Sequence, residues 1–283
     1  MMLTDGKLQT LIRPLVGNPW SRLVRDTGWL HSVLQIAIVL ALVLATATAA
    51  EYGLFKAAED NFRGATSWTR SSSASGQLHL VEMDAASMAE YRRWPWPRTH
   101  YGKVVDRLNV AGVRSIAFDV DFSAASDPGS DQAFADALAR SEAEIILPTF
   151  SQWATFADTD AGEYGERRML DALPIPILRE HVMLGSVSMF ADKDGMVRTM
   201  PLGTVTQGVP RPSLVAQIAK QSGEVGEVFP VNLALDPSTI PRHSFAAVED
   251  GKFDAADLHG KDILIGATAV ELFDRYPVPG HGV

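Results

Sequence analysis

The apolar positions of the chain form one long uninterrupted run near the N-terminus, followed by many shorter segments. Over residues 33–50 only one glutamine and two threonines interrupt the apolar side chains, and no Asp, Glu, Lys or Arg occurs between Asp26 and Glu51. A helix of about 20 such residues crosses the hydrocarbon core of a membrane. The pattern therefore predicts a transmembrane helix over residues 31–50. A buried core helix and a cleaved signal peptide are the alternatives, the second because Ala45-Thr46-Ala47 resembles a cleavage site.

The charges before the apolar run predict which way it crosses the membrane. Basic residues precede the run at Lys7, Arg13, Arg22 and Arg25. Because basic residues that flank a first helix tend to stay in the cytoplasm, we expect residues 1–30 to form a cytoplasmic segment. No later stretch is long and apolar enough to span again. The rest of the chain is therefore expected in the periplasm of a bacterium, anchored to its inner (cytoplasmic) membrane.

Residues 51–77 are predicted to form a stalk between the membrane and a globular domain. They begin with a helical pattern and run into Ser71-Ser72-Ser73-Ala74-Ser75-Gly76, a composition typical of linkers. We place the globular domain at residues 78–283.

The globular region opens with strand and helix patterns in alternation. Short apolar runs predict strands at residues 78–83, 115–122 and 144–147, the last closed by Pro148. Apolar side chains at helical spacing predict a helix from about Thr99 to Gly112 and a second at residues 130–140. Strands that alternate with helices over short connections indicate a parallel sheet.

The second half of the region is less regular. Strands are predicted at residues 182–190 and 196–202, joined by a turn over residues 191–195. A helix is expected at residues 213–220 and a buried strand at residues 262–266. The predicted fold class is therefore α/β, with a mixed, mostly parallel sheet flanked by helices and preceded by one N-terminal transmembrane helix.

Composition and missing motifs exclude several classes of function. The net charge of -9 argues against a nucleic-acid surface. The absence of cysteine excludes a cysteine nucleophile, a thiolate zinc site and a disulfide framework. The seven histidines lack metal-ligand spacing, and no GxGxxG, Walker, HExxH or GxSxG motif occurs. We therefore predict no enzyme, no cofactor and no metal site in this chain.

Aspartates at predicted strand ends are the most suggestive chemical feature. Asp119 and Asp121 alternate along one strand and so share a face, and Asp84 ends another strand. Two neighbouring carboxylates repel, so they need a cation, an arginine or water. The carboxyl ends of parallel strands gather at one edge, where α/β ligand sites form. The alternative is that these aspartates cap the following loops and pair with Arg98 or Arg114.

A tryptophan-proline loop precedes the first predicted helix. The loop is Trp94-Pro95-Trp96-Pro97-Arg98, and its two indoles are expected either to stack on a ligand or to pack over the core. The arginine is expected either to bind an anion or to pair with Asp84 or Asp121. The candidate ligand-binding residues are Asp84, Trp94, Trp96, Arg98, Asp119 and Asp121.

Five motifs follow one another through the globular region. They are Val81-Glu82-Met83-Asp84, the tryptophan-proline loop, residues 111–122 (AGVRSIAFDVDF), Asp194-Gly195-Met196-Val197-Arg198 ahead of Pro201-Leu202, and residues 258–268 (LHGKDILIGAT). In this order they resemble the extracellular sensor family CHASE, type two, over residues 78–283. The resemblance implies an N-terminal membrane helix, a sensor outside, further membrane helices and a cytoplasmic output domain. Outputs in the family include adenylyl cyclase, diguanylate cyclase, cyclic-di-GMP phosphodiesterase and kinases.

The sequence is interpreted as the sensor region of such a signalling protein. It stops at Val283, where the later helices of the family are expected, so we expect a C-terminally truncated domain. The signal is expected to be a small molecule or a protein, and the assembly a homodimer. Two alternatives stay open: a dimerisation scaffold without a small ligand, and an exported metal-dependent hydrolase using Asp119 and Asp121.

Overall fold

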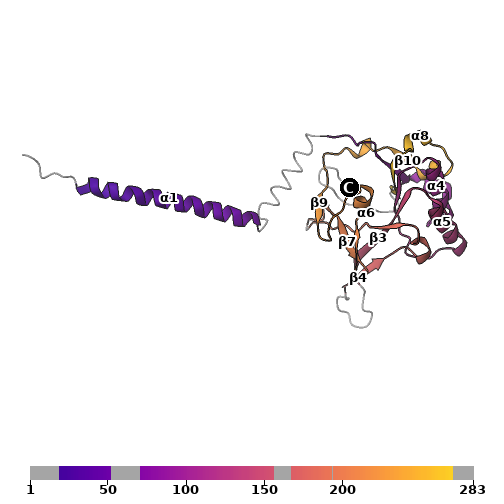
Figure 1. The fold of residues 1–283 in the computed structure, drawn as a ribbon, viewed down its shortest axis with the longest axis horizontal. Coiled ribbons are helices and arrows are strands. Elements are labelled where there is room, and N and C mark those ends of the chain that lie inside the picture. Colours follow the sequence, from indigo (N-terminus) through magenta and orange to yellow (C-terminus); the bar gives the residue numbers. More distant parts are fainter. Residues whose placement is uncertain (1–18, 52–70, 156–166, 193, 270–283) are drawn as a thin grey trace, which may run out of the picture. The chain divides into compact units, whose positions relative to one another are not determined.

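The computed structural model describes residues 19–51, 71–155, 167–192 and 194–269. The chain divides into two compact units, Met1–Arg63 and Gly64–Val283. The first contributes one described helix and the second an α/β domain (Figure 1). Each unit is therefore considered by itself.

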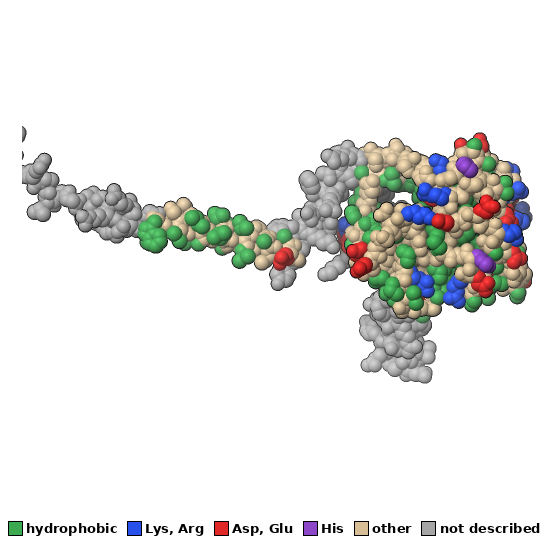
Figure 2. Space-filling model, in the orientation of Figure 1, with side chains coloured by type: hydrophobic (Ala, Val, Ile, Leu, Met, Phe, Trp, Pro, Cys, Tyr) green, Lys and Arg blue, Asp and Glu red, His purple; other side chains and the backbone are tan. Residues whose placement is uncertain are grey.

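Helix α1 (Pro19–Glu51) is the described part of the first unit. From Trp29 to Glu51 it is long and apolar enough to cross a membrane, and none of that stretch is buried. The leucines and valines from Leu30 to Leu44 are exposed, as the space-filling view shows for one side (Figure 2). A helix that is apolar all round needs apolar surroundings. The helix is therefore a candidate membrane span, as the sequence predicts.

The second unit is built on a seven-stranded sheet, and its parallel character is confirmed. Only the pairing of β3 with β4 is antiparallel. The strand order is β10 (Arg242–Ser244), β1 (Leu78–Met83), β11 (Asp262–Ala267), β2 (Ser115–Asp119), β3 (Glu144–Thr155) and β4 (Arg167–Ala172), with β5 (Met183–Ser186) also on β3.

Strand β11 is the last described strand in the chain, yet it lies between β1 and β2. All six of its residues are in register with β1, from Leu78 opposite Asp262 to Met83 opposite Ala267. A strand between two parallel neighbours is covered on both faces, which explains its apolar run Ile263-Leu264-Ile265. This insertion separates β1 from β2, which follow each other among the strands along the chain.

Helices cover the two faces of the sheet unequally (Figure 1). Side chains alternate along each strand, so Ile116 and Phe118 face one layer while Ala117 faces the other. The first layer holds α3 (Ala85–Tyr91), α4 (Arg98–Val110), α5 (Pro128–Arg140), α7 (Phe245–Glu249) and α8 (Ala255–Leu258). On the other face, α6 (Leu214–Ile218) contacts β2, β3 and β5.

Local signals explain where these helices begin. The Asp127 carboxylate accepts a hydrogen bond from the Ser130 amide and Pro128 occupies the first turn of α5. Ser213 caps α6 in the same way through the Ala216 amide. Two 3₁₀ turns complete the described helical elements, η1 (Pro176–Leu178) and η2 (Pro237–Thr239).

Two small antiparallel sheets complete the domain: β6 (Thr199–Pro201) pairs with β9 (Val228–Pro230), and β7 (Gly203–Thr206) pairs with β8 (Val209–Pro212). The strands predicted at residues 182–190 and 196–202 therefore do not pair with each other, because β5 joins β3 instead. The turn between them is present. Its ends are tied by the Asp192 amide to the Met196 carbonyl, 2.8 Å, and by the Arg198–Asp192 ion pair.

Two strand ends predicted in the first half of the domain are also wrong. β2 ends at Asp119 instead of residue 122, and β3 continues past Pro148 to Thr155. The Thr149 carbonyl accepts from the Val187 amide on the β5 side, so the nitrogen of Pro148 faces the β2 side. Pairing with β2 has already ended at Ile146. A proline there removes no ladder bond and is tolerated.

Candidate functional site

The carboxyl ends of the parallel strands meet at one edge, which holds three of the six predicted ligand-binding residues. Asp84 follows β1, Asp119 ends β2, and Asp121 lies just beyond. Because β11 separates the two strands, Asp84 and Asp119 are two strand spacings apart, about 10 Å. The aspartates thus share an edge but not one carboxylate cluster.

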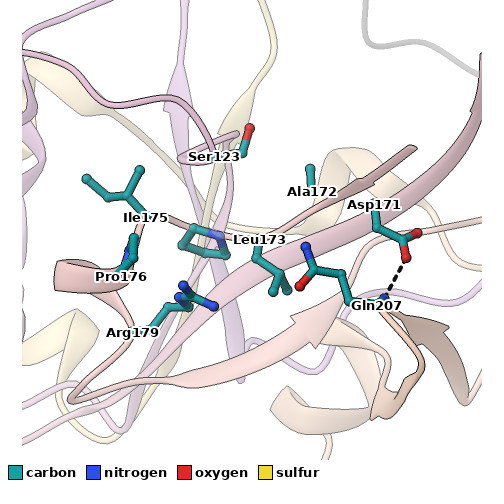
Figure 3. Close-up of a pocket in the computed structure, with 9 residues that line it drawn as sticks. Ser123, Asp171, Ala172, Leu173, Ile175, Pro176, Arg179 and Gln207 are labelled. Atoms are coloured by element: carbon teal, nitrogen blue, oxygen red, sulfur yellow. Dashed lines mark hydrogen bonds between the residues drawn. The ribbon is translucent and has the colours of Figure 1, made fainter. Parts of the chain in front are cut away.

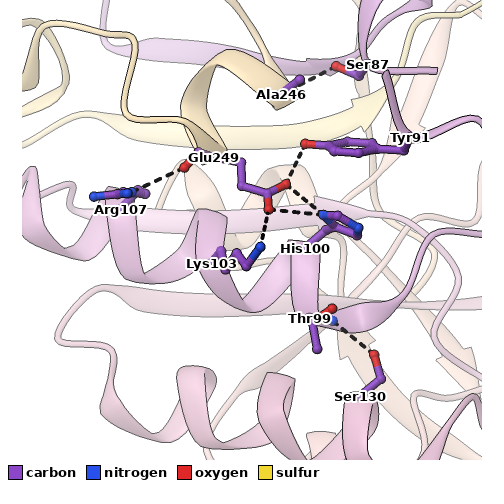
Figure 4. Close-up of polar contacts among 9 residues, drawn as sticks. All are labelled: Ser87, Tyr91, Thr99, His100, Lys103, Arg107, Ser130, Ala246 and Glu249. Carbon is purple, nitrogen blue, oxygen red and sulfur yellow. Dashed lines mark hydrogen bonds and ion pairs between the residues drawn. The ribbon is translucent and has the colours of Figure 1, made fainter. Parts of the chain in front are cut away.

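Asp84 is the N-cap of helix α3 and a joint between two chain segments. Its Oδ1 accepts from the Ser87 amide at 2.9 Å, the Ser87 hydroxyl at 2.6 Å and the Ser244 hydroxyl at 3.0 Å. The Ser87 hydroxyl in turn accepts from the Ala246 amide. The carboxylate therefore ties the start of α3 to the junction of β10 and α7 (Figure 4 shows the Ser87–Ala246 bond).

Asp119 and Asp121 are both exposed, because the strand ends at the first of them. The Asp121 Oδ1 accepts a hydrogen bond from the Ser123 amide at 2.7 Å. Within the described ranges no group of three His, Cys, Asp or Glu side chains could hold a metal ion. Water can solvate both carboxylates, so they need no buried counter-ion.

Arg98 is buried at the start of helix α4, and its partner is Asp131. The guanidinium Nη1 lies 2.8 Å from the Asp131 carboxylate, and Nη2 reaches the carbonyls of Phe122 and Ala124. Its Cζ also lies 5.5 Å from the centre of the Phe122 ring. Arg98 thus holds α5 and the loop after β2 together, and pairs with neither Asp84 nor Asp121.

The two tryptophans of the loop have different surroundings. Trp96 is 3% exposed, and its ring lies 5.0 Å from Phe245 and 4.8 Å from Tyr91, centre to centre. Trp94 is 44% exposed and meets Trp96 edge to face at 5.5 Å. Trp96 therefore belongs to the aromatic core, whereas Trp94 presents an aromatic surface to solvent.

A pocket of about 320 Å³ opens beside the loop that follows β2 (Figure 3). Its polar groups are Ser123, Asp171, Arg179 and Gln207, and its apolar wall includes Leu173. The Asp171 Oδ2 accepts a hydrogen bond from the backbone amide of Gln207 at 2.6 Å, while the buried Oδ1 of Asp171 has no partner among the described residues. A pocket with a guanidinium and amide groups over an apolar wall suits a small polar ligand.

Sequence reasoning missed this pocket. Ser123 follows the motif at residues 111–122, but most of the lining residues come from the end of β4, from η1 and from the turn between β7 and β8, which are far apart in the chain. These three segments carry no motif, so no local signal identifies them.

A second polar centre surrounds Glu249 at the end of α7 (Figure 4). Its nearly buried carboxylate accepts from the Tyr91 hydroxyl, the Lys103 ammonium at 2.8 Å and the His100 Nδ1 at 2.8 Å. Burial opposes the charged form, but the hydrogen bonds from Lys103, Tyr91 and His100 prevail and lower the pKa of Glu249. Burial and the bond to Glu249 raise the pKa of Tyr91. This centre joins α3, α4 and α7.

A family model for the CHASE2 domain matches residues 36–281, which is most of the chain. The chain belongs to the CHASE2 family. CHASE2 is a sensor domain family of bacterial signalling proteins, so the chain is a sensor region. The match begins inside α1 and continues through the α/β domain. No curated protein and no solved structure matches the chain.

Proposed function

We propose that this CHASE2 domain is the periplasmic signal-input module of a bacterial inner-membrane receptor. The observation that carries the proposal is helix α1, whose apolar side chains are exposed over a length sufficient to cross a membrane. The α/β domain follows that helix and belongs to a sensor family. Residues 1–30 would then lie in the cytoplasm and residues 78–283 in the periplasm, since basic residues precede the helix.

The output is proposed to be a cytoplasmic cyclic-nucleotide enzyme, acting on cyclic-di-GMP or cAMP, or a kinase, carried by the same protein as a homodimer. A ligand can bias such an output only if it binds two conformations with different affinity, a difference of roughly 1–3 kcal/mol. One way for the sensor domain to change state without unfolding is to keep its core and to rearrange the edges of its sheet.

The six predicted ligand-binding residues remain our candidates, and they divide into residues that are exposed to solvent and residues that are buried or already bonded. Trp94, Asp119 and Asp121 reach solvent directly, so a ligand can touch them in this conformation. Trp96 and Arg98 are buried and Asp84 is occupied as a cap, so they would act on a ligand through their neighbours. Asp121 is bonded to Ser123 of the pocket, which extends the candidate ligand edge to Arg179 and Asp171.

The ligand edge is tested by substitution of its exposed members. Trp94→Ala with Asp121→Asn should abolish the response of the full-length receptor while the thermal midpoint of the domain changes little. Arg179→Gln should reduce the response in the same way, because it removes the cation of the pocket. A receptor that responds normally with all three replacements would exclude this edge as the ligand site.

The orientation is tested with paired reporter insertions. Alkaline phosphatase or green fluorescent protein is inserted after Gly208, in the turn between β7 and β8, where the glycine has open space around it. Phosphatase activity without fluorescence is the expected result, because alkaline phosphatase folds in the periplasm and the fluorescent protein in the cytoplasm. The same reporters fused before Met1 serve as the matched control and should show the reverse. Fluorescence at Gly208 would place the domain inside and overturn the proposal.

A further inference from the structure

Two histidines that lie 164 positions apart in the sequence face each other across strands β1 and β10. The His79 Nδ1 lies 3.0 Å from the His243 Nε2, within hydrogen-bond distance, and the two rings are nearly parallel, at 5°. His79 is 6% exposed, so water has little access to its ring. Neither residue takes part in the ligand edge described above.

The chemistry of imidazole makes this contact depend on protonation. A neutral imidazole has one N–H donor and one acceptor nitrogen, so one ring can donate to the other. One additional proton still leaves a donor facing an acceptor. When both rings are protonated, two N–H groups and two positive charges face each other at 3.0 Å, and the bond is replaced by repulsion.

The surroundings oppose the doubly protonated state. Burial lowers the pKa of both His79 and His243, and each is lowered further by a positive charge: Lys261 for His79, and His79 itself for His243. Asp257 of α8 acts in the opposite direction on both, as does a backbone hydrogen bond at Gly76 on His79. The Arg242–Glu82 ion pair joins the same two strands but lies on the other face of the sheet.

The strand that His243 anchors is short and lies at the sheet edge. β10 pairs with β1 through only three residue pairs. The segment ahead of β10 binds residues 71–77, which lead into β1: the Ser72 amide donates to the Ala234 carbonyl at 2.8 Å, and the Ala74 amide donates to the Thr239 hydroxyl at 2.8 Å. The described end of the predicted stalk is therefore held by the chain segment that leads into β10.

We propose that His79 and His243 form an acid-sensitive clasp that releases β10 and residues 71–77 when both imidazoles are protonated. Residues 71–77 follow the candidate membrane helix in sequence, so their release would alter the connection through which the domain acts on the membrane. The physiological role rests on the proposed function, because only a domain outside the cytoplasm meets acid medium directly. The protonation itself is a property of the purified protein.

The sign of the effect follows from the direction of the two shifts. Histidines with a lowered pKa bind fewer protons in the folded state than in an opened one, where the ordinary value is about 6.5. The clasp therefore stabilises the closed state fully above about pH 6.5, and this stabilisation decreases as the pH falls below that value. Each unit of difference in pKa between the closed and opened states is worth a factor of ten in the opening equilibrium.

Hydrogen exchange of the whole chain in detergent micelles tests the clasp. Protection of the amides of β10 and residues 71–77, corrected for the intrinsic effect of pH on exchange, is compared at pH 7.5 and 5.5. The lower pH of 5.5 still lies above the usual pKa of carboxylates, which is about 4. The protection of β10 and residues 71–77 should fall by about tenfold or more at pH 5.5, while β2 keeps its protection. Equal corrected protection at the two pH values would overturn the proposal.

Three variants separate the clasp from a general effect of acid. His243→Gln keeps an amide N–H that can donate to His79 and removes one of the two protonation sites, so its protection should depend less on pH than that of the wild type. His79→Gln should behave alike. His181→Gln removes an exposed histidine and should retain the acid response of the wild type. An acid response in His243→Gln as large as that of the wild type would exclude the clasp.

If the Gln variants fail to fold, the clasp is tested on the wild type by NMR signals of the histidine rings that report protonation. With ¹⁵N-labelled histidine, His79 and His243 should titrate below the ordinary imidazole pKa of about 6.5 and in two separate steps, because the second proton is repelled by the first. A single step at the ordinary imidazole pKa would contradict the clasp. The reporter insertions and these measurements are independent, since a cytoplasmic location would leave the exchange result unchanged and remove only its role in sensing acid medium.

Discussion

The two faces of the central sheet are stabilised by different means. One face lies under five helices and carries a continuous aromatic core, in which the Tyr101 ring lies 5.4 Å from both Phe122 and Phe245. The other face is covered by the five-residue helix α6 and by the β7–β8 pair, and its buried apolar cluster is Ala117, Ile146, Leu214 and Ile218. The first face contains charged centres at Arg98 and Glu249. The second face buries the carboxylate of Asp262, which accepts from the Ser115 hydroxyl at 2.7 Å, together with contacts between hydroxyls such as Thr204 to Ser186 at 2.6 Å.

This difference indicates which part of a sensor can move. Large interlocking side chains and buried charges allow one arrangement, because any displacement leaves a cavity or an unpaired charge. A small core and short strands are displaced at lower cost. We therefore expect signals to rearrange the sheet edges and the α6 side while the aromatic face stays fixed. The following substitutions are chosen to break or sharpen this contrast, beginning with the largest effect.

Breaking the Arg98–Asp131 ion pair should cost the most. Both side chains are less than 10% exposed, so Arg98→Met leaves the Asp131 carboxylate buried without its cation. We expect a loss of about 3–5 kcal/mol in the free energy of unfolding, measured by urea denaturation of the whole chain. Arg140→Met is the matched control, because the Arg140–Asp106 pair is exposed and is worth about 0–1 kcal/mol. Equal effects in the two variants would refute the assignment of Arg98 as a structural residue.

The contrast between the faces is measured most directly with one substitution made on each. Leu108 of α4 is 0% exposed on the aromatic side, and Leu214 of α6 is 4% exposed on the other. Leu→Ala costs about 2–5 kcal/mol, and the cost rises where the surroundings cannot collapse into the cavity. Leu108→Ala should fall at about 4 kcal/mol and Leu214→Ala at about 2 kcal/mol in the same urea assay. The reverse order would show that the α6 side is the rigid one.

The sequence predicts the elements of this fold well, because their signals are local. Strand β1 was expected over the residues it occupies, and the helix expected from Thr99 begins one residue earlier, at Arg98. The position of β11 could not be predicted. An apolar run shows that a strand is buried, but not which two strands it separates, and that placement decides the distance between Asp84 and Asp119.

The candidate site was predicted only in part, for a related reason. The edge follows from the direction of parallel strands, yet the partner of Arg98 depends on how α5 packs against α4. Asp131 lies in the first turn of a helix, where an acidic residue also serves the helix dipole, so nothing marks it as a partner. The contacts of Glu249 with Tyr91 and His100 likewise join residues about 150 positions apart.

Glu249 provides a pH-dependent test of the aromatic face. Its folded pKa is lowered, so its contribution is present above the unfolded value of about 4.5 and is lost as the pH falls through the lower folded value. Glu249→Gln should lower the free energy of unfolding by about 1–3 kcal/mol at pH 7, because the amide is a weaker acceptor. The difference from the wild type should shrink at pH 3. A difference that is independent of pH would show that the carboxylate charge is not what matters.

The smallest expected effect concerns Asp84, and it decides whether this residue is a cap or a ligand contact. Asp84→Ala removes the acceptor of the Ser87 amide and of two hydroxyls, whereas Asp84→Asn keeps an oxygen that can cap the helix. We expect a loss of about 1–2 kcal/mol for Ala and clearly less for Asn, measured by urea denaturation. A cap tolerates the neutral amide, while a group that binds a cationic ligand requires the charge. If Asp84→Asn keeps the stability of the domain and abolishes the response of the receptor, Asp84 contacts the ligand. If the response survives in Asp84→Asn and weakens only with the stability in Asp84→Ala, the carboxylate belongs to the fixed face of the sheet.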